Sequence, residues 1–358
     1  MTAQIASEEL DVLVVGGGAA GLSGALTLAR ARRSVLVVDS GEPRNAPAAA
    51  AHGLLTRDGT PPLELLRLGR EEVARYGGQF VSDRAVSARR VEGGFVVEAG
   101  SGRSFQARRL LVTTGLVDEL PEIPGLRERW GRDVLHCPYC HGWEVRDRPI
   151  GVLGGSPMSV HQALLFRQWS PEVTLFLHTG EDLAEEQWER LAARGITVID
   201  GEVTGLVVDD EDRLAGVRLA SGRQVPVESM AVATRLVARS ELLSSLGLGS
   251  VEHPMGVGMH VPSDASGLTE VAGVWVAGNV TDLMATVPVA QAAGQQAAAA
   301  INMDLVNADT DAAVARRRAA ASGGVFGPVG EAEVCARVLG ESRHGLDSLL
   351  RSEDPARP

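Results

Sequence analysis

Short runs of consecutive apolar residues alternate with helix-length segments along most of the chain. Residues 12–15 and 35–38 are apolar at every position, which is typical of strands buried on both faces of a parallel sheet. Between them, residues 19–29 carry apolar side chains at helical spacing. Similar strand-like runs recur at 80–81, 95–97, 110–112, 150–153, 173–177 and 274–277, and helix-like segments at 63–76, 159–169 and 291–301. This alternation predicts an α/β fold with parallel sheets and with ligands at the carboxyl ends of the strands.

A glycine-rich turn follows the first strand. Gly16, Gly18 and Gly21 have the G-x-G-x-x-G spacing, a helix follows, and Asp39 ends the next strand. In this motif the first glycine makes a tight turn, the second lets the backbone approach a pyrophosphate, and the third lets the helix pack against the strand. The acid can hold a ribose hydroxyl. Because both strands and the acid are present, the pattern predicts a dinucleotide site rather than a purely structural turn.

A second strand–turn–helix unit begins at residue 150, but its turn departs from the motif. Gly154 matches the first glycine, whereas Ser156 and Ser159 stand at the second and third positions. A side chain at 156 crowds the place where a pyrophosphate approaches the backbone, and Pro157 lacks an N–H for a phosphate. The sequence therefore predicts a second nucleotide fold whose site is degenerate, with the alternative that a diverged loop binds a cofactor through other groups.

Two of the three cysteines, Cys137 and Cys140, are separated by two residues, and His141 follows them directly. Such a pair can close and reopen a disulfide, and it needs an electron partner. Imidazole, with an ordinary pKa near ~6.5, can take a proton from an attacking thiol and return it to a leaving thiolate. His136 is the alternative for this role, and either histidine could instead be structural. No second cysteine pair completes a tetrahedral zinc set, and Cys335 has no neighbouring cysteine, so we predict no metal site.

Charge and composition exclude several classes of partner. The net charge of −12 disfavours nucleic acid and anionic membranes. The sequence contains no lysine, which excludes Schiff-base chemistry through that residue. Residues 1–10 lack the basic and apolar regions of a signal peptide, and no uncharged apolar run long enough to span a membrane follows. We therefore expect a cytoplasmic protein with no nucleic-acid or membrane partner.

Over residues 9–305 the sequence resembles the low-molecular-weight thioredoxin reductase family of FAD flavoproteins. The resemblance rests on GGGAAG at 16–21, TTG at 113–115, CPYC at 137–140 and AGNVTD at 277–282. It implies a homodimer whose subunits contain two nested Rossmann-like, three-layer domains. The expected domains are an FAD-binding domain at 1–117 and 245–305, an inserted degenerate NAD(P)-binding-like domain with the CxxC at 118–244, and a surface-packed or partly disordered C-terminal extension at 306–358.

The resemblance also implies roles for individual residues. Cys140 would lie against the flavin, and Cys137 would exchange with substrate thiols. Asn279 stands where the family has an acid, and Val287-Pro288 replaces an arginine-glutamine pair that contacts the flavin. The expected cofactor-binding residues are Gly16, Gly18, Ala19, Ala20, Gly21, Asp39, Ser40, Arg44, Asn45, Thr114, Gly115, Gly278, Asn279 and Val287.

The direction of electron flow follows from the second unit. Relatives that use NADPH grip its 2′-phosphate with a histidine and two arginines, whereas this chain reads His178-Thr179-Gly180. Each lost charge-assisted bond is worth roughly 1.5 to 3 kcal/mol. Electrons would then pass from a small-molecule dithiol through the CxxC to FAD and on to O2, giving H2O2.

The CPYCHG segment and the lost clamp resemble the dithiol oxidases that close disulfides in gliotoxin and holomycin. We therefore predict an FAD-dependent dithiol oxidase. An NADPH-dependent thioredoxin-disulfide reductase and a flavin redox sensor without turnover remain the alternatives.

Overall fold

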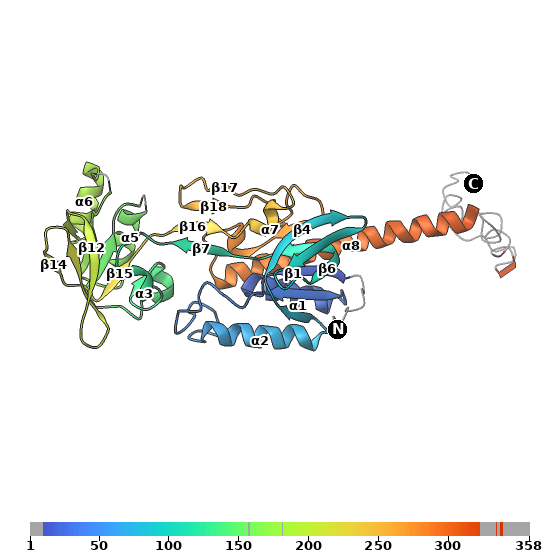
Figure 1. Ribbon diagram of the computed structural model, residues 1–358, viewed down its shortest axis with the longest axis horizontal. Coiled ribbons are helices and arrows are strands. Elements are labelled where there is room, and N and C mark those ends of the chain that lie inside the picture. The colour runs from blue at the N-terminus through green and yellow to red at the C-terminus, as the bar shows by residue number, and fades with distance from the viewer. Residues whose placement is uncertain (1–9, 157, 181, 323–333, 335–336, 339–358) are drawn as a thin grey trace, which may run out of the picture. The chain divides into compact units, whose positions relative to one another are not determined.

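The computed structural model describes residues 10–156, 158–180, 182–322, 334, 337 and 338. Pro157, Cys335 and most of the predicted C-terminal extension lie outside the described residues. The chain divides into two units, Met1–Asn302 and Met303–Pro358. The first unit contains two lobes, each built on its own sheet, and both nucleotide-type turns lie in it (Figure 1).

The first lobe is built on a seven-stranded sheet in the order β3-β2-β1-β6-β5-β4, with β19 also paired to β6. β1, β2, β3, β6 and β19 are parallel, whereas β4 and β5 form an antiparallel meander with β6. The elements are β1 (Leu10–Val15), α1 (Ala19–Arg30), β2 (Val35–Asp39), α2 (Pro62–Arg75), β3 (Gln79–Ser82), β4 (Ala85–Val91), β5 (Gly94–Ala99), β6 (Ser104–Val112) and β19 (Val274–Val276). β1 and β2 are buried where the sequence is continuously apolar, as predicted.

The second lobe holds a five-stranded, fully parallel sheet in the order β11-β10-β9-β15-β8, next to a three-stranded antiparallel sheet β12-β13-β14. Its elements are α3 (Leu126–Arg129), β8 (Val134–Leu135), α4 (Pro138–His141), β9 (Ile150–Leu153), α5 (Ser159–Phe166), β10 (Val173–Phe176), α6 (Glu185–Ala193), β11 (Thr197–Ile199), β12 (Val203–Val208), β13 (Leu214–Leu219), β14 (Gln224–Val225) and β15 (Ser229–Ala231). The helix predicted at 159–169 ends at Phe166, because residues 167–170 turn back through hydrogen bonds to the last helical carbonyls.

Two antiparallel strands, β7 (Leu116–Glu119) and β16 (Arg235–Ala238), carry the chain into and out of the second lobe. β16 also pairs with β18 (Gly258–His260), which pairs with β17 (Val251–Glu252). α7 (Glu241–Ser244) follows β16, and its Leu242 and Leu243 pack into the core of the first lobe. The boundaries at 117/118 and 244/245 stay predictions.

The last helix, α8 (Val287–Ser322), is much longer than the predicted segment at 291–301. Pro288 stands in its first turn, where a missing N–H costs nothing, and an alanine-rich sequence continues it. The short 3-10 helix η1 (Gly278–Val280) precedes it. Where α8 crosses α1, a Cβ added at Gly294 would lie 2.0 Å from the carbonyl oxygen of Ala20, so the crossing requires glycine.

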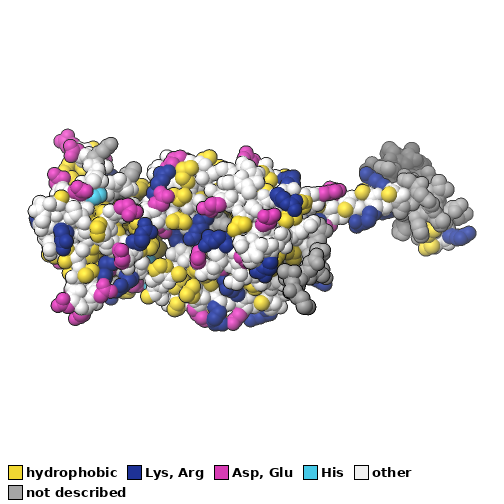
Figure 2. Space-filling view, in the orientation of Figure 1, with side chains coloured by type: hydrophobic (Ala, Val, Ile, Leu, Met, Phe, Trp, Pro, Cys, Tyr) yellow, Lys and Arg dark blue, Asp and Glu magenta, His cyan; other side chains and the backbone are white. Residues whose placement is uncertain are grey.

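Surface charges are paired locally. Figure 2 shows acidic and arginine side chains interspersed over the visible face, and Arg67, for example, contacts both Glu64 and Glu71 on α2. Within the described part of the chain, no helix is both long enough and apolar enough to cross a bilayer.

Candidate active site

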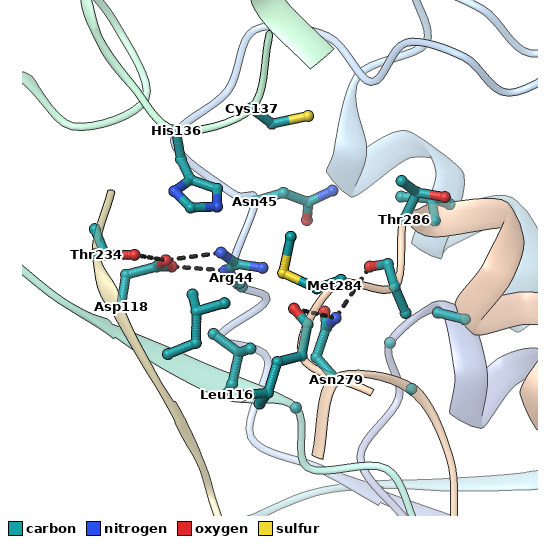
Figure 3. Close-up of a pocket in the computed structure, with 18 of the residues that line it drawn as sticks. Arg44, Asn45, Leu116, Asp118, His136, Cys137, Thr234, Asn279, Met284 and Thr286 are labelled. Atoms are coloured by element: carbon teal, nitrogen blue, oxygen red, sulfur yellow. Dashed lines mark hydrogen bonds and ion pairs between the residues drawn. The ribbon is translucent and has the colours of Figure 1, made fainter. Parts of the chain in front are cut away.

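A cavity of about 1410 Å³ lies where the carboxyl ends of the first-lobe strands face the CxxC of the second lobe. Every residue predicted for the site lines it except Gly21. Gly21 acts in packing instead, because a Cβ there would lie 1.9 Å from the carbonyl oxygen of Gly16. Figure 3 shows Cys137, Asn45 and Asn279 together around this space, although they come from distant parts of the sequence.

The glycine turn has the geometry of a dinucleotide cradle. Gly16 has a φ of +102°, and an added Cβ would lie 2.5 Å from the carbonyl oxygen of Thr113. At Gly18 the same Cβ would meet nothing within 4 Å, so the backbone there is open to the cavity. Asp39 accepts the N–H of Gly17 at 3.0 Å and is paired with Arg70. These residues fit the pyrophosphate and ribose of a dinucleotide at the start of α1.

The loop after β19 supplies the opposite wall. Gly278 has a φ of +75° and approaches the side chain of Ala20, where a Cβ would lie 2.9 Å away. The Nδ2 of Asn279 donates to the carbonyl oxygens of Asp282 and Ala285, both at 3.0 Å (Figure 3). The amide nitrogen therefore holds the loop, which leaves the Oδ1 to serve a ligand. Val287 begins α8 at the same wall.

Arg44 is held by an acid that the sequence did not single out. Its Nε and Nη2 donate to the two carboxylate oxygens of Asp118 at 2.6 and 2.7 Å, and Thr234 donates to the same carboxylate at 2.8 Å (Figure 3). Burial raises the pKa of Asp118, but the hydrogen bonds and charge of Arg44, together with Thr234, hold it below its usual value. Arg44 thus lines the cavity as a member of an ion pair, with its positive charge largely compensated by Asp118.

Cys137 and Cys140 form a disulfide with their Cα atoms 5.3 Å apart. Cys137 caps the short helix α4, and its sulfur accepts the N–H of Cys140 at 3.2 Å. Pro138 occupies the first turn, where its missing N–H is not needed. The local sequence therefore folds the pair into a turn that brings both sulfurs to the cavity.

Both histidines beside the cysteines are neutral at pH 7. Burial lowers the pKa of His141, with Glu144 raising it and His52 lowering it to smaller extents. Burial, followed by the charge of Arg44, lowers the pKa of His136, whose Nδ1 lies 3.2 Å from the carbonyl oxygen of Val232. His136 is thus engaged by backbone. The Nδ1 of His141 is buried without a partner among the described residues, and its ring lines the cavity.

A second cluster near His141 was not predicted. His52 lies between two carboxylates, 3.3 Å from Asp58 and 3.4 Å from Glu144. It comes from the loop after β2, whereas Glu144 follows the CxxC, so the cluster joins the two lobes. Nothing in the spacing of these residues signals the contact, because it forms only when the lobes fold together.

The aromatic residues beside the cysteines differ in placement. Tyr139 lines the cavity and packs edge-on against Trp169, with ring centroids 5.6 Å apart. Trp143 is outside the lining and carries Arg146 over its ring at 4.1 Å. Of these two residues, Tyr139 is therefore the one placed to contact a molecule bound at the disulfide.

In the degenerate second turn, serine hydroxyls accept the backbone N–H groups of the turn itself. The hydroxyl of Ser159 accepts the N–H of Ser156 at 3.2 Å and donates to the carbonyl oxygen of Leu153 at 3.0 Å. The hydroxyl of Ser156 accepts the N–H of Met158 at 3.2 Å. Two N–H groups that face a phosphate in a nucleotide turn are thus already bonded.

The residue that follows the next strand is also engaged. His178 accepts the N–H of Val203 on its Nδ1 at 3.0 Å, and burial lowers its pKa. A neutral ring held by the backbone of β12 offers no positive charge to a 2′-phosphate.

Residues 10–296 match the pyridine nucleotide-disulphide oxidoreductase family, and the chain belongs to it. Within that family it is a thioredoxin reductase-like enzyme with a redox cysteine pair, so the predicted fold class and enzyme class are confirmed. The family typically binds FAD.

Solved structures and relatives agree with this assignment. The chain is similar to HlmI, with 47% identity and a TM-score of 0.82 over 87% of this chain and 97% of HlmI. It is also similar to an oxidoreductase from Agrobacterium tumefaciens, at 36% identity and a TM-score of 0.77 over 83% of this chain and 99% of that one. The protein named thioredoxin reductase tcpT, from Claviceps purpurea, is 31% identical over 314 residues, which cover 84% of this chain and 96% of tcpT.

Proposed function

We propose that this protein is an FAD-dependent dithiol oxidase that closes a disulfide in a small-molecule dithiol, with O2 as electron acceptor. One observation carries the proposal: the disulfide shares a cavity with an intact dinucleotide turn, while the second turn satisfies its own N–H groups. Among the described residues of the second turn, the N–H groups of Ser156 and Met158 are thus not free for a phosphate of NADPH, which supports electron entry by another route. The dithiol is the remaining source of electrons.

The residues that would hold FAD are those of the cradle. Gly18 and the start of α1 fit the pyrophosphate, Asp39 the ribose, and the Oδ1 of Asn279 a ribityl hydroxyl. When bound, FAD supplies a two-electron path from the reduced cysteine pair to O2, which leaves as H2O2.

The chain's own chemistry is thiol–disulfide exchange. A thiolate of the substrate attacks the sulfur of Cys137, forms a mixed disulfide and releases Cys140 as a thiolate. The second substrate thiol then attacks the substrate sulfur of this mixed disulfide, so that the product disulfide closes and Cys137 leaves as a thiolate. The two electrons that the substrate dithiol loses on oxidation now reside on the reduced cysteine pair. His141, neutral at pH 7 and lining the cavity, accepts the proton of an attacking thiol.

The assignment of the two sulfurs also belongs to this proposal. Cys140 would face the flavin and Cys137 the substrate, in a homodimeric, cytoplasmic enzyme without nucleic-acid or membrane partners. The homodimer and the location stay predictions.

Oxygen consumption with a neutral dithiol tests the proposal. The FAD-loaded protein, given dihydrolipoamide in air, should form one H2O2 per disulfide. Under strict anaerobiosis the reaction should stop after at most two dithiols per subunit, because the Cys137–Cys140 disulfide and FAD each accept two electrons. With NADPH and no thiol, the yellow flavin band should persist. Rapid bleaching by NADPH would instead identify a disulfide reductase. Flavin that responds to dithiols without steady oxygen uptake would identify a redox sensor.

A further inference from the structure

The cavity continues past the disulfide onto one face of α5. Met158, His161, Gln162 and Leu165 line it, and their spacing of three and four residues places them on a single side of the helix. This set is called the α5 wall below. None of these residues belongs to the dinucleotide cradle.

The α5 wall is fixed to the CxxC turn. The Nε2 of Gln162 donates to the carbonyl oxygen of His136 at 2.8 Å, one residue before Cys137, and Gln162 is only 7% exposed. At the other end, Gly142 packs directly on Trp169, since an added Cβ would lie 2.7 Å from the indole. A molecule that reacts at the disulfide therefore has the α5 wall as a neighbour in a fixed position.

Charge is distributed unevenly around the cavity. Among the described residues, every acidic or arginine side chain in the lining comes from the first lobe or from the two connecting strands and their ends, including Asp39, Arg44, Asp118 and Arg239. The lining from Gly131 to Leu165 contributes neither an acid nor an arginine. The stretch holds three histidines: His136 and His141 are neutral at pH 7 because burial lowers the pKa of each, and His161 is exposed on the α5 wall.

We propose that the α5 wall is the specificity-determining surface of the dithiol site, and that it selects dithiols whose body beside the two sulfurs is uncharged. The proposal rests on the dithiol chemistry proposed above and names its substrate class. A charged group on that body would lose water against Met158 and Leu165 without gaining a counter-charge, which costs free energy. The degenerate nucleotide unit thus supplies a substrate wall in place of a cofactor site.

Two probes with the same dithiol and different charge test the α5 wall: neutral dihydrolipoamide and anionic dihydrolipoate. The full-length, FAD-loaded protein is mixed anaerobically with each probe, and the disulfide formed in the probe is followed by rapid quenching, thiol alkylation and mass spectrometry. This readout counts each exchange even where FAD reoxidises Cys137–Cys140. The wild type should react faster with the amide by about fivefold or more. This readout needs no oxygen turnover, so the α5 wall can be tested even if the oxidase proposal fails.

Arginine substitutions supply the decisive comparison. His161→Arg, at an exposed position that threatens no packing, and Leu165→Arg should each shift the rate ratio toward dihydrolipoate by about fivefold. Gln168→Arg is the matched control, because it adds the same charge at an exposed position just beyond α5 and outside the lining. Its ratio should stay that of the wild type.

Two results would overturn the proposal: equal rates for the two probes with the wild type, or ratios in His161→Arg and Leu165→Arg that match the Gln168→Arg control. The second result includes a shift shared by all three variants, which would report the protein's net charge rather than the α5 wall.

Discussion

Arg44 donates two hydrogen bonds to the carboxylate of Asp118, at 2.6 and 2.7 Å, from a loop of the first lobe to the strand that leads into the second. The Asp118 side chain is only 6% exposed, whereas that of Arg44 is 31% exposed. A buried carboxylate depends on its partner much more than a surface one does. The pair therefore links the loop beside the dinucleotide cradle to the position of the CxxC lobe.

Arg44→Ala should lower the free energy of unfolding by about 2 to 3 kcal/mol, because it leaves the Asp118 carboxylate buried with Thr234 as its remaining partner. Urea unfolding at pH 7 measures this loss. Arg84→Ala is the control, since its partner Glu42 and Arg84 itself are both more than half exposed, and it should cost less than about 1 kcal/mol. Equal losses in the two variants would contradict the role given to Arg44.

Two glycine-to-alanine changes in the same motif should affect different properties: Gly18→Ala the affinity for FAD, and Gly21→Ala the stability of the apoprotein. At Gly18 an added Cβ meets open space, so the apoprotein should unfold at the wild-type urea concentration while FAD affinity falls by about tenfold or more. At Gly21 the Cβ would lie 1.9 Å from the carbonyl oxygen of Gly16, so the apoprotein itself should lose more than about 2 kcal/mol. Urea unfolding of the two apoproteins and FAD titration separate these outcomes. Unchanged FAD binding in Gly18→Ala would exclude this turn as the pyrophosphate site.

Local patterns predicted the parts of the site that are contiguous in sequence. The turn around Gly16 and the CxxC turn at Cys137 each form within a few residues, so their motifs suffice. The pairing of Arg44 with Asp118 joins residues 74 positions apart, and no local periodicity encodes it. The same holds for His52 and Glu144. The length of α8 was underestimated for a different reason, because polar and charged residues after Ile301 do not end a helix when no glycine or proline follows until 323.

His136 should make stability depend on pH. Its pKa in the folded protein is lowered, mainly by burial, so between that value and the unfolded pKa near ~6.5 the unfolded chain binds more protons. The free energy of unfolding therefore has its full value, as far as His136 is concerned, above about pH 6.5. It decreases as pH falls below that value, by at most about 1.4 kcal/mol per pH unit. His136→Asn keeps a donor for the carbonyl of Val232 and should flatten this slope in urea unfolding between pH 5 and 7. An unchanged slope would mean that other groups cause it.

Asn279→Asp tests whether the side-chain amide of Asn279 stabilises the loop after β19 or acts only in binding a ligand. The Nδ2 donates to the carbonyl oxygens of Asp282 and Ala285, and a carboxylate would face both with no proton to offer. The apoprotein should lose about 1 to 3 kcal/mol of stability, even though an acid is usual here in the family. Asn279→Ala, which removes the donor without adding charge, should cost less. If Asn279→Asp is as stable as the wild type, the loop does not depend on these hydrogen bonds.

The two cysteines should differ in their effect on FAD absorption. If Cys140 is the flavin-proximal sulfur, Cys137→Ser leaves a single thiolate against the oxidised ring, and a long-wavelength shoulder should appear without reductant, whereas Cys140→Ser should lack it. Both variants should lose turnover, because either change removes the disulfide that accepts electrons from the dithiol. Since only the thiolate donates charge, the shoulder should fade as pH falls through the thiol pKa. Absorption spectra of the two FAD-loaded variants from pH 5 to 9 measure this, and a shoulder in Cys140→Ser alone would reverse the order of the two sulfurs.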